Sequence, residues 1–178
     1  MSNKNTLEKI IVIAIAIFAI PIHELGHWLG YKFNGISAVL SYNYTDPLTN
    51  PENIWGLSGG PLISLGLALL GLTMMYFNKR NKDIWAYFSV VMCLTRIVPY
   101  IFFILIPNGF QSNDEGLIAK VLGLQIGAVY ITFLALFIGI LSVIAYAYKG
   151  NFQDHLNKYR LGYGLYLLSI ILFGVHIT

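Results

Sequence analysis

The chain has 178 residues, of which 57% are hydrophobic and only 11% are charged, and its net charge is +3. Soluble domains carry about 25% charged residues, so this composition excludes a water-soluble globular protein and predicts lipid around most of the chain. The net charge is weak and no long basic run accompanies it, which gives no indication of a nucleic-acid partner. The single cysteine, Cys93, excludes an intramolecular disulfide and a cysteine-rich metal site.

Apolar stretches predict an all-α membrane protein with about five transmembrane helices. A membrane-spanning helix needs about 20 mostly apolar residues, and five segments reach or approach that length: 7–33, 59–77, 84–107, 117–148 and 161–177. The fourth is too long for one straight span, and we expect its beginning, with Lys120 and Gln125, to lie at the membrane interface. Its Gly123 and Gly127 fit a close-packing helix motif. We treat the whole chain, 1–178, as one transmembrane domain.

Basic residues gather on one side of the predicted spans. Eight of the eleven precede the first span or lie in the second and fourth connections, namely Lys4, Lys9, Lys79, Arg80, Lys82, Lys149, Lys158 and Arg160. The loops 34–58 and 108–116 hold none. The positive-inside rule then predicts a plasma-membrane protein with its N-terminus in the cytosol and its C-terminus outside.

Residues 36–45 alternate in polarity between the first two spans. Ile36, Ala38 and Leu40 alternate with Ser37 and Val39, and the pattern continues to residue 45 with the period of a half-buried strand. The following Asp-Pro pair at 46–47 has turn chemistry that should end the strand. We therefore expect a small β-strand or hairpin on the membrane surface after the first helix.

The motif that carries chemistry is His23-Glu24-Leu25-Gly26-His27. Histidines at i and i+4 lie on one face of a helix, so both imidazoles can bind one metal ion, and Glu24 beside the first ligand suits a general base. Zinc lowers the pKa of a coordinated water to about 7, which makes hydroxide available at neutral pH. Ionisable residues inside an apolar span indicate a functional site because burying them without partners is costly.

Zinc catalysis requires three protein ligands, so a third ligand must be found. On the same predicted side of the membrane the carboxylates are Asp46, Glu52, Asp114 and Glu115. Turn composition explains Asp46. The pair Asp114-Glu115 stands between the third and fourth spans, where helix capping and first-turn acidity are the alternative explanation.

The order of these features resembles the site-2 protease family of intramembrane zinc metalloproteases. A first helix with the His-Glu-His motif precedes a strand-like loop, a Gly-Gly-Pro element at 59–61 opens the second helix, and an acidic Asp-Glu-Gly follows the third. The resemblance covers about residues 8–125, and the helices of about 126–178 would be an addition. It implies proteolysis of a transmembrane or membrane-associated peptide, with membrane lipid as the surrounding partner.

The family resemblance also implies roles for individual residues. One Zn²⁺ per chain would be held by His23, His27 and a carboxylate that maps best onto Asp114, with Glu115 as rival. Glu24 would be the catalytic base.

Substrate binding would fall, by the same resemblance, to Ile36, Ala38 and Leu40 of the strand and to Gly60, Pro61 and Ser64 of the second helix. Ser64 stands where the family commonly has asparagine, and the third motif is looser than the usual Leu-Asp-Gly.

Two further points stay open at this level. Arg96 falls midway along the third span and serves either as electrostatic support for the catalytic carboxylates or oxyanion, or as a structural ion-pair partner. The charge bias places the active site toward the outer face. The alternative function is a metal-binding membrane protein without catalysis, such as an immunity or regulatory factor on a degenerate protease scaffold. Ser64 and the loose third motif favour this alternative, and the intact Glu24 argues against it.

Overall fold

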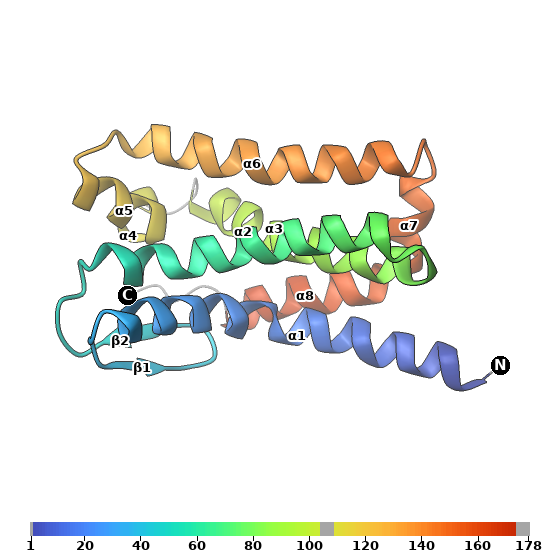
Figure 1. Cartoon of the computed structure of the whole chain (residues 1–178), viewed down its shortest axis with the longest axis horizontal. Coiled ribbons are helices and arrows are strands. Elements are labelled where there is room, and N and C mark those ends of the chain that lie inside the picture. The colour runs from blue at the N-terminus through green and yellow to red at the C-terminus, as the bar shows by residue number, and fades with distance from the viewer. Residues whose placement is uncertain (1, 104–108, 174–178) are drawn as a thin grey trace.

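The computed structural model describes residues 2–103 and 109–173, most of which are helical. The elements in chain order are α1 Ser2–Phe33, β1 Ala38–Leu40, β2 Thr45–Pro47, α2 Ile54–Phe77, the 3₁₀ turn η1 Lys79–Asn81, α3 Lys82–Phe103, α4 Gly109–Ser112, α5 Asp114–Leu122, α6 Ile126–Ala147, α7 Phe152–Lys158 and α8 Arg160–Phe173. The long helices form one bundle, with the hairpin, α4 and α5 at one end and α7 at the other (Figure 1).

Four helices among the described residues are long and apolar enough to cross a membrane: Asn5–Phe33, Ile54–Phe77, Lys79–Phe103 and Ile126–Ala147. They correspond to the first four predicted segments, so the mostly helical fold with apolar helices of membrane-spanning length is confirmed. The fifth expected span is not confirmed, because the apolar part of α8 covers only Arg160–Leu172. A helix of that length rises about 20 Å, less than the hydrocarbon thickness. Positions 104–107 and 174–177 of the predicted spans lie outside the described residues.

The predicted segment 117–148 is two helices rather than one. Gly123 ends α5 with a φ of 65°, and its N–H contacts the carbonyls of Ala119 and Lys120, while Leu124 N–H donates to Ala119 O over 2.8 Å. Glycine suits this left-handed position because it has no Cβ. Helix α6 then restarts after Gln125. The packing motif expected at Gly123 and Gly127 is wrong, since a Cβ at either would meet no described atom within 4 Å.

The surface β element is a hairpin, but its turn comes earlier than the sequence predicts. Strands β1 and β2 pair antiparallel, with Ala38 opposite Pro47 and Leu40 opposite Thr45. Ser41 N–H donates to Tyr44 O over 3.0 Å, so residues 41–44 close the turn. The expectation that Asp46-Pro47 ends the strand is wrong. Hydrogen-bonded and non-hydrogen-bonded pairs alternate along an antiparallel ladder. Because Leu48 N–H donates to Ser37 O, the neighbouring pair of Ala38 and Pro47 is non-hydrogen-bonded, and the missing N–H of Pro47 costs no hydrogen bond between the strands.

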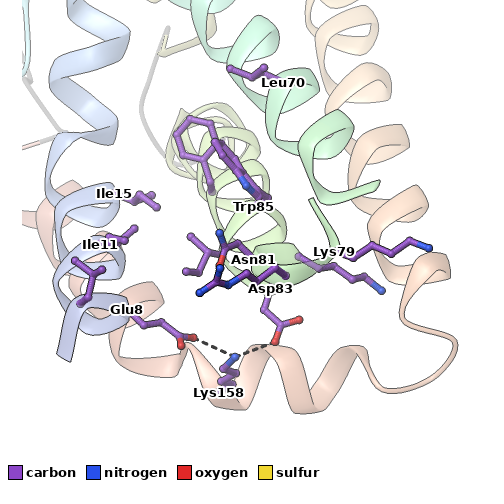
Figure 2. A pocket seen from close by; sticks show the side chains of 14 residues that line it. Glu8, Ile11, Ile15, Leu70, Lys79, Asn81, Asp83, Trp85 and Lys158 are labelled. Atoms are coloured by element: carbon purple, nitrogen blue, oxygen red, sulfur yellow. Dashed lines mark hydrogen bonds and ion pairs between the residues drawn. The ribbon is translucent and has the colours of Figure 1, made fainter. Parts of the chain in front are cut away.

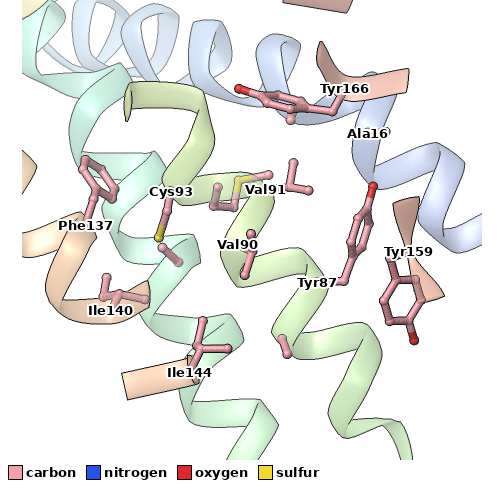
Figure 3. Packing of buried hydrophobic residues seen from close by; sticks show 14 of the residues in the cluster. Ala16, Tyr87, Val90, Val91, Cys93, Phe137, Ile140, Ile144, Tyr159 and Tyr166 are labelled. Atoms are coloured by element: carbon pink, nitrogen blue, oxygen red, sulfur yellow. The ribbon is translucent and has the colours of Figure 1, made fainter. Parts of the chain in front are cut away.

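The hydrophobic core lies between α1, α2, α3, α6 and α8 (Figure 3). Tyr87 from α3 is fully buried, packs against Tyr159, and donates from its hydroxyl to Val12 O over 3.2 Å. Phe137 of α6 fills the other side of the cluster. Cys93 is fully buried in the same cluster, as a small apolar residue would be. The core therefore fixes the long helices relative to one another on both sides of α3.

Glycines bring α1 and α2 into backbone contact beside the His-Glu-His motif. A Cβ on Gly26 would lie 2.8 Å from the carbonyl carbon of Gly59, and one on Gly59 would lie 2.6 Å from that of Gly26. Such distances leave no room for any side chain. Small residues at a membrane-helix crossing allow this approach, and here the crossing falls at the motif, so it sets how the two histidines face α2.

The end of the bundle near the N-terminus holds a cavity of ≈ 940 Å³ between α1, the α2–α3 connection and α7. Lys158 pairs there with Glu8 over 3.0 Å and with Asp83 over 2.8 Å (Figure 2). Leu70 and Trp85 line the apolar side. Glu8 and the first histidine of the motif are fifteen positions apart on α1, or about 22 Å along the helix. This cavity is therefore separate from the chemistry described next.

Candidate metal centre

Two histidines of α1 face the interior of the bundle instead of lipid. His23 and His27 are only 7% and 6% exposed. One helical turn separates them, and their rings meet edge to face with centroids 4.8 Å apart. Asp114, the first residue of α5, lies beside them although it is 91 positions after His23 in the chain. The His23, His27 and Asp114 side chains form the one group of potential metal ligands found in the part of the chain that the structure describes.

The three ligand atoms form a nearly equilateral triangle. His23 Nε2 lies 3.2 Å from His27 Nε2 and 3.2 Å from Asp114 Oδ2, and the third side, His27 Nε2 to Asp114 Oδ2, measures 3.3 Å. Ligands at zinc–nitrogen distances of about 2.0–2.1 Å in tetrahedral geometry lie about 3.3 Å from one another. The donor set, two imidazoles and a carboxylate, is one that catalytic zinc sites use. The residues therefore fit a zinc ion in type and in spacing.

Hydrogen bonds behind the rings set the histidine tautomers. His27 Nδ1 lies 2.8 Å from the carbonyl oxygen of Gly56, which can only accept, so Nδ1 carries a proton. His23 Nδ1 lies 2.9 Å from Ser64 Oγ. Arg96, which can only donate, approaches His23 Nε2, so the His23 proton is on Nδ1. In the neutral form each ring then has an unprotonated Nε2, 3.2 Å from Asp114 Oδ2 for His23 and 3.3 Å for His27. Such bonds orient metal-binding histidines.

Asp114 is held at the start of α5 by its neighbours. The side chain of Asn113 caps the helix by accepting from Gly116 N–H over 3.1 Å, and it also accepts from the Tyr130 hydroxyl. Burial alone would raise the pKa of the Asp114 carboxyl, but its interactions with His27 and Arg96 outweigh burial and hold that pKa well below its ordinary value. The carboxylate is therefore anionic, the form that binds a metal ion.

Glu115 does not belong to the triad, which consists of His23, His27 and Asp114. Its side chain is fully buried and accepts hydrogen bonds from Arg96 Nε over 3.1 Å and from the Tyr100 hydroxyl over 2.6 Å, and Arg96 Nη2 also pairs with it. A buried carboxylate needs such partners. Of the two acidic residues considered as third ligand, the structure brings only Asp114 to the histidines.

Glu24 follows the first histidine ligand and is half-buried. Its carboxylate lies within electrostatic range of His27, Asp114 and Arg96. The hairpin is attached at this residue, because Thr45 Oγ1 donates to Glu24 O over 2.8 Å. The residue that the motif predicts as a base is therefore tied through its backbone to β2.

The residues of α2 predicted to bind substrate lie behind the histidines. Ser64 is 1% exposed, and its only described polar contact is the bond to His23. A Cβ on Gly60 would meet the rings of both histidines, at 2.6 Å from His23 Cε1. Pro61 is fully buried. These positions contact the two histidines of the candidate metal centre, a role that sequence reasoning missed, and their part in substrate binding stays a prediction.

The strand residues predicted to bind substrate differ in exposure. Ile36 precedes β1 and is buried, Ala38 is half-buried, and Leu40 is 42% exposed. The Ala38 carbonyl accepts from Trp28 Nε1 over 3.1 Å, which ties β1 to α1. The hairpin is also joined to α1 by the Tyr42 hydroxyl, which donates to Ile17 O over 2.7 Å. It thus lies along the half of α1 that bears the metal ligands.

Comparisons with protein-family models, with curated proteins and with solved structures found no match. The interpretation of this centre consequently depends on the residues of the chain itself.

Proposed function

We propose that the protein is an intramembrane zinc metalloprotease that hydrolyses a peptide bond in or near a membrane-spanning segment or in a small peptide precursor. The observation that carries this proposal is the triangle of His23, His27 and Asp114 beside Glu24, with both histidines on a helix apolar enough to span a membrane. A metal-binding protein without catalysis has no need of a carboxylate beside the ligands. Glu24 therefore favours the protease over the alternative.

The roles of the residues follow from their places. His23, His27 and Asp114 would hold the ion, and Ser64 and the Gly56 carbonyl orient the two rings. A bound zinc ion supplies Lewis-acid polarisation of the scissile carbonyl and lowers the pKa of water. Glu24 takes a proton from the attacking water and delivers it to the leaving amine, as a general base and then a general acid.

A substrate helix hides its peptide bonds in backbone hydrogen bonds, so it must unwind before cleavage. The hairpin offers an edge for the extended segment, in the manner of β-strand addition. In the non-hydrogen-bonded pair of Leu40 and Thr45 the backbone groups of Leu40 point away from β2. These groups lie on the edge of β1 away from β2, where the Ala38 carbonyl accepts from Trp28 Nε1 and so ties the same edge to α1. By the distribution of basic residues, the site faces the outer side of the plasma membrane.

The test compares cells that express the wild type, Glu24→Gln and a control, Glu52→Gln, and identifies new peptide termini in the membrane fraction. Glu52 is exposed, and the one ion pair that it makes among the described residues is with Lys120, so we expect its replacement to leave His23, His27 and Asp114 undisturbed. We expect termini that appear with the wild type and Glu52→Gln and vanish with Glu24→Gln, although all three proteins retain zinc. Identical termini in all three, with zinc bound, would establish the non-catalytic alternative.

A further inference from the structure

Arg96 is the positive charge closest to the proposed ligands. It lies on α3, is 5% exposed, and directs Nη1 at two members of the triad. Nη1 lies 2.9 Å from Asp114 Oδ2 and 2.9 Å from His23 Nε2. Burial of the guanidinium lowers the dielectric around it, which strengthens these contacts.

The contact with His23 conflicts with metal binding. Nε2 of a neutral imidazole has a single lone pair in the ring plane, which either accepts an N–H or binds an ion. In this structure the lone pair of His23 faces an Arg96 N–H. The carboxylate of Asp114 has lone pairs enough for both the guanidinium and an ion. His23 is therefore the ligand for which the guanidinium and an ion compete.

The other half of the guanidinium is fixed. Nε and Nη2 of Arg96 form the paired contacts with Glu115, whose carboxylate also accepts from Tyr100. Bidentate contacts of this kind set the plane of the guanidinium. Only Nη1 remains to reach His23 and Asp114, so the Glu115 contacts determine where Nη1 lies.

We propose that Arg96 is an internal counter-cation of the metal centre. In the metal-free protein it holds His23 and Asp114 together, and it lowers the affinity for zinc because an entering ion must displace Nη1 from His23. Arg96 is thus a positioning residue that sets metal affinity, and Glu115 determines where its guanidinium lies. This inference rests on the proposed metal centre and adds a competitor for one of its ligands.

The electrostatics of the cluster point the same way. Three acceptor atoms about 3.3 Å apart repel one another unless a proton or a cation lies among them. Arg96 supplies that charge when the ion does not. Removing Arg96 should therefore increase the repulsion among the three side chains in the absence of metal. It should also increase their affinity for an added cation.

The experiment removes Arg96 without stranding a buried carboxylate. Arg96→Gln alone would leave Glu115 unpaired and is expected to misfold, so we compare Glu115→Gln with the double variant Arg96→Gln/Glu115→Gln. Zinc affinity is measured in detergent by competition with a chelator, and melting temperature is recorded with chelator and with excess zinc. Arg80→Gln, which removes an exposed cation from the α2–α3 connection, controls for the change in net charge.

We expect the double variant to bind zinc at least tenfold more tightly than Glu115→Gln. It should also melt at a lower temperature in chelator, so that zinc raises its melting temperature more than that of Glu115→Gln. Arg80→Gln should bind zinc like the wild type. Equal or weaker binding by the double variant overturns the inference while leaving the metal centre in place. Absence of zinc from every one of these proteins overturns both.

Discussion

Replacing Gly59 by alanine tests whether the contact between α1 and α2 sets the geometry of the metal centre. The new Cβ would lie 2.6 Å from the carbonyl carbon of Gly26, whereas ordinary van der Waals contact begins at 3.4 Å. The atoms that it meets belong to the backbone of α1, so no side-chain rotation relieves the clash. The two helices would have to separate locally by at least the difference, about 0.8 Å, because the carbonyl oxygen of Gly26 lies closer still.

That separation would weaken two hydrogen bonds across the same interface. His27 Nδ1 to Gly56 O measures 2.8 Å and His23 Nδ1 to Ser64 Oγ measures 2.9 Å, and a further 0.8 Å puts both beyond hydrogen-bond range. Each lost bond costs about 1 kcal/mol, and overpacking costs about 1–3 kcal/mol. Alanine returns about 1 kcal/mol of helix propensity. We expect Gly59→Ala to lower the free energy of unfolding by about 2–4 kcal/mol.

The assay is reversible unfolding in mixed detergent micelles, followed by circular dichroism, together with zinc affinity. Gly66→Ala is the matched control, because it adds the same methyl group to the same helix where no described atom lies within 4 Å of the new Cβ. Gly66→Ala should be as stable as the wild type or slightly more stable, with unchanged zinc affinity. Gly59→Ala should have both a lower free energy of unfolding and a lower zinc affinity. If the two variants matched in stability and in zinc affinity, the packing argument would be refuted.

Three other perturbations have defined outcomes. Ser64→Ala removes the partner of His23 Nδ1 and should weaken zinc binding about 10–100-fold, as measured by chelator competition, while the fold is retained. His155 is buried, its Nδ1 has no hydrogen-bond partner within the described part of the chain, and burial lowers its pKa to about 4. The unfolded chain therefore takes up its proton near pH 6.5, before the folded protein does, and stability falls as the pH drops from 6.5 toward 4. His155→Phe should remove about 2 kcal/mol of that loss, after allowance for solvent screening, which thermal melts of both proteins across this range would reveal. Tyr87→Phe removes the buried hydroxyl that donates to Val12 O and should cost about 1 kcal/mol in unfolding free energy, and no change would mean that this contact contributes nothing.

Much of the fold was predictable because the bilayer imposes simple demands on the sequence. Long apolar runs predicted the spanning helices, and the alternating pattern after the first of them predicted a β element. The division of 117–148 depended on local backbone chemistry at Gly123, which has the same sequence appearance as a packing glycine. The glycines that do pack, Gly26 and Gly59, are recognised only when α1 and α2 are seen together.

The candidate site was predictable only where one segment carries it. The i and i+4 spacing of His23 and His27 is a property of a single helix. The acidic pair before the fourth predicted span left two candidates for the third ligand, Asp114 and Glu115. The choice of Asp114 over Glu115 depended on contacts with Arg96 from α3, which no local pattern encodes. The Ser64 contact with His23 joins positions 41 apart in the chain and was missed for the same reason.

The most direct test of the account is the zinc content of the detergent-purified protein. The account predicts one zinc ion per chain in the wild type and in Glu24→Gln, and loss of zinc in His23→Ala and in Asp114→Asn. A wild-type protein that binds no zinc, or an Asp114→Asn variant that retains it fully, would contradict the proposed centre.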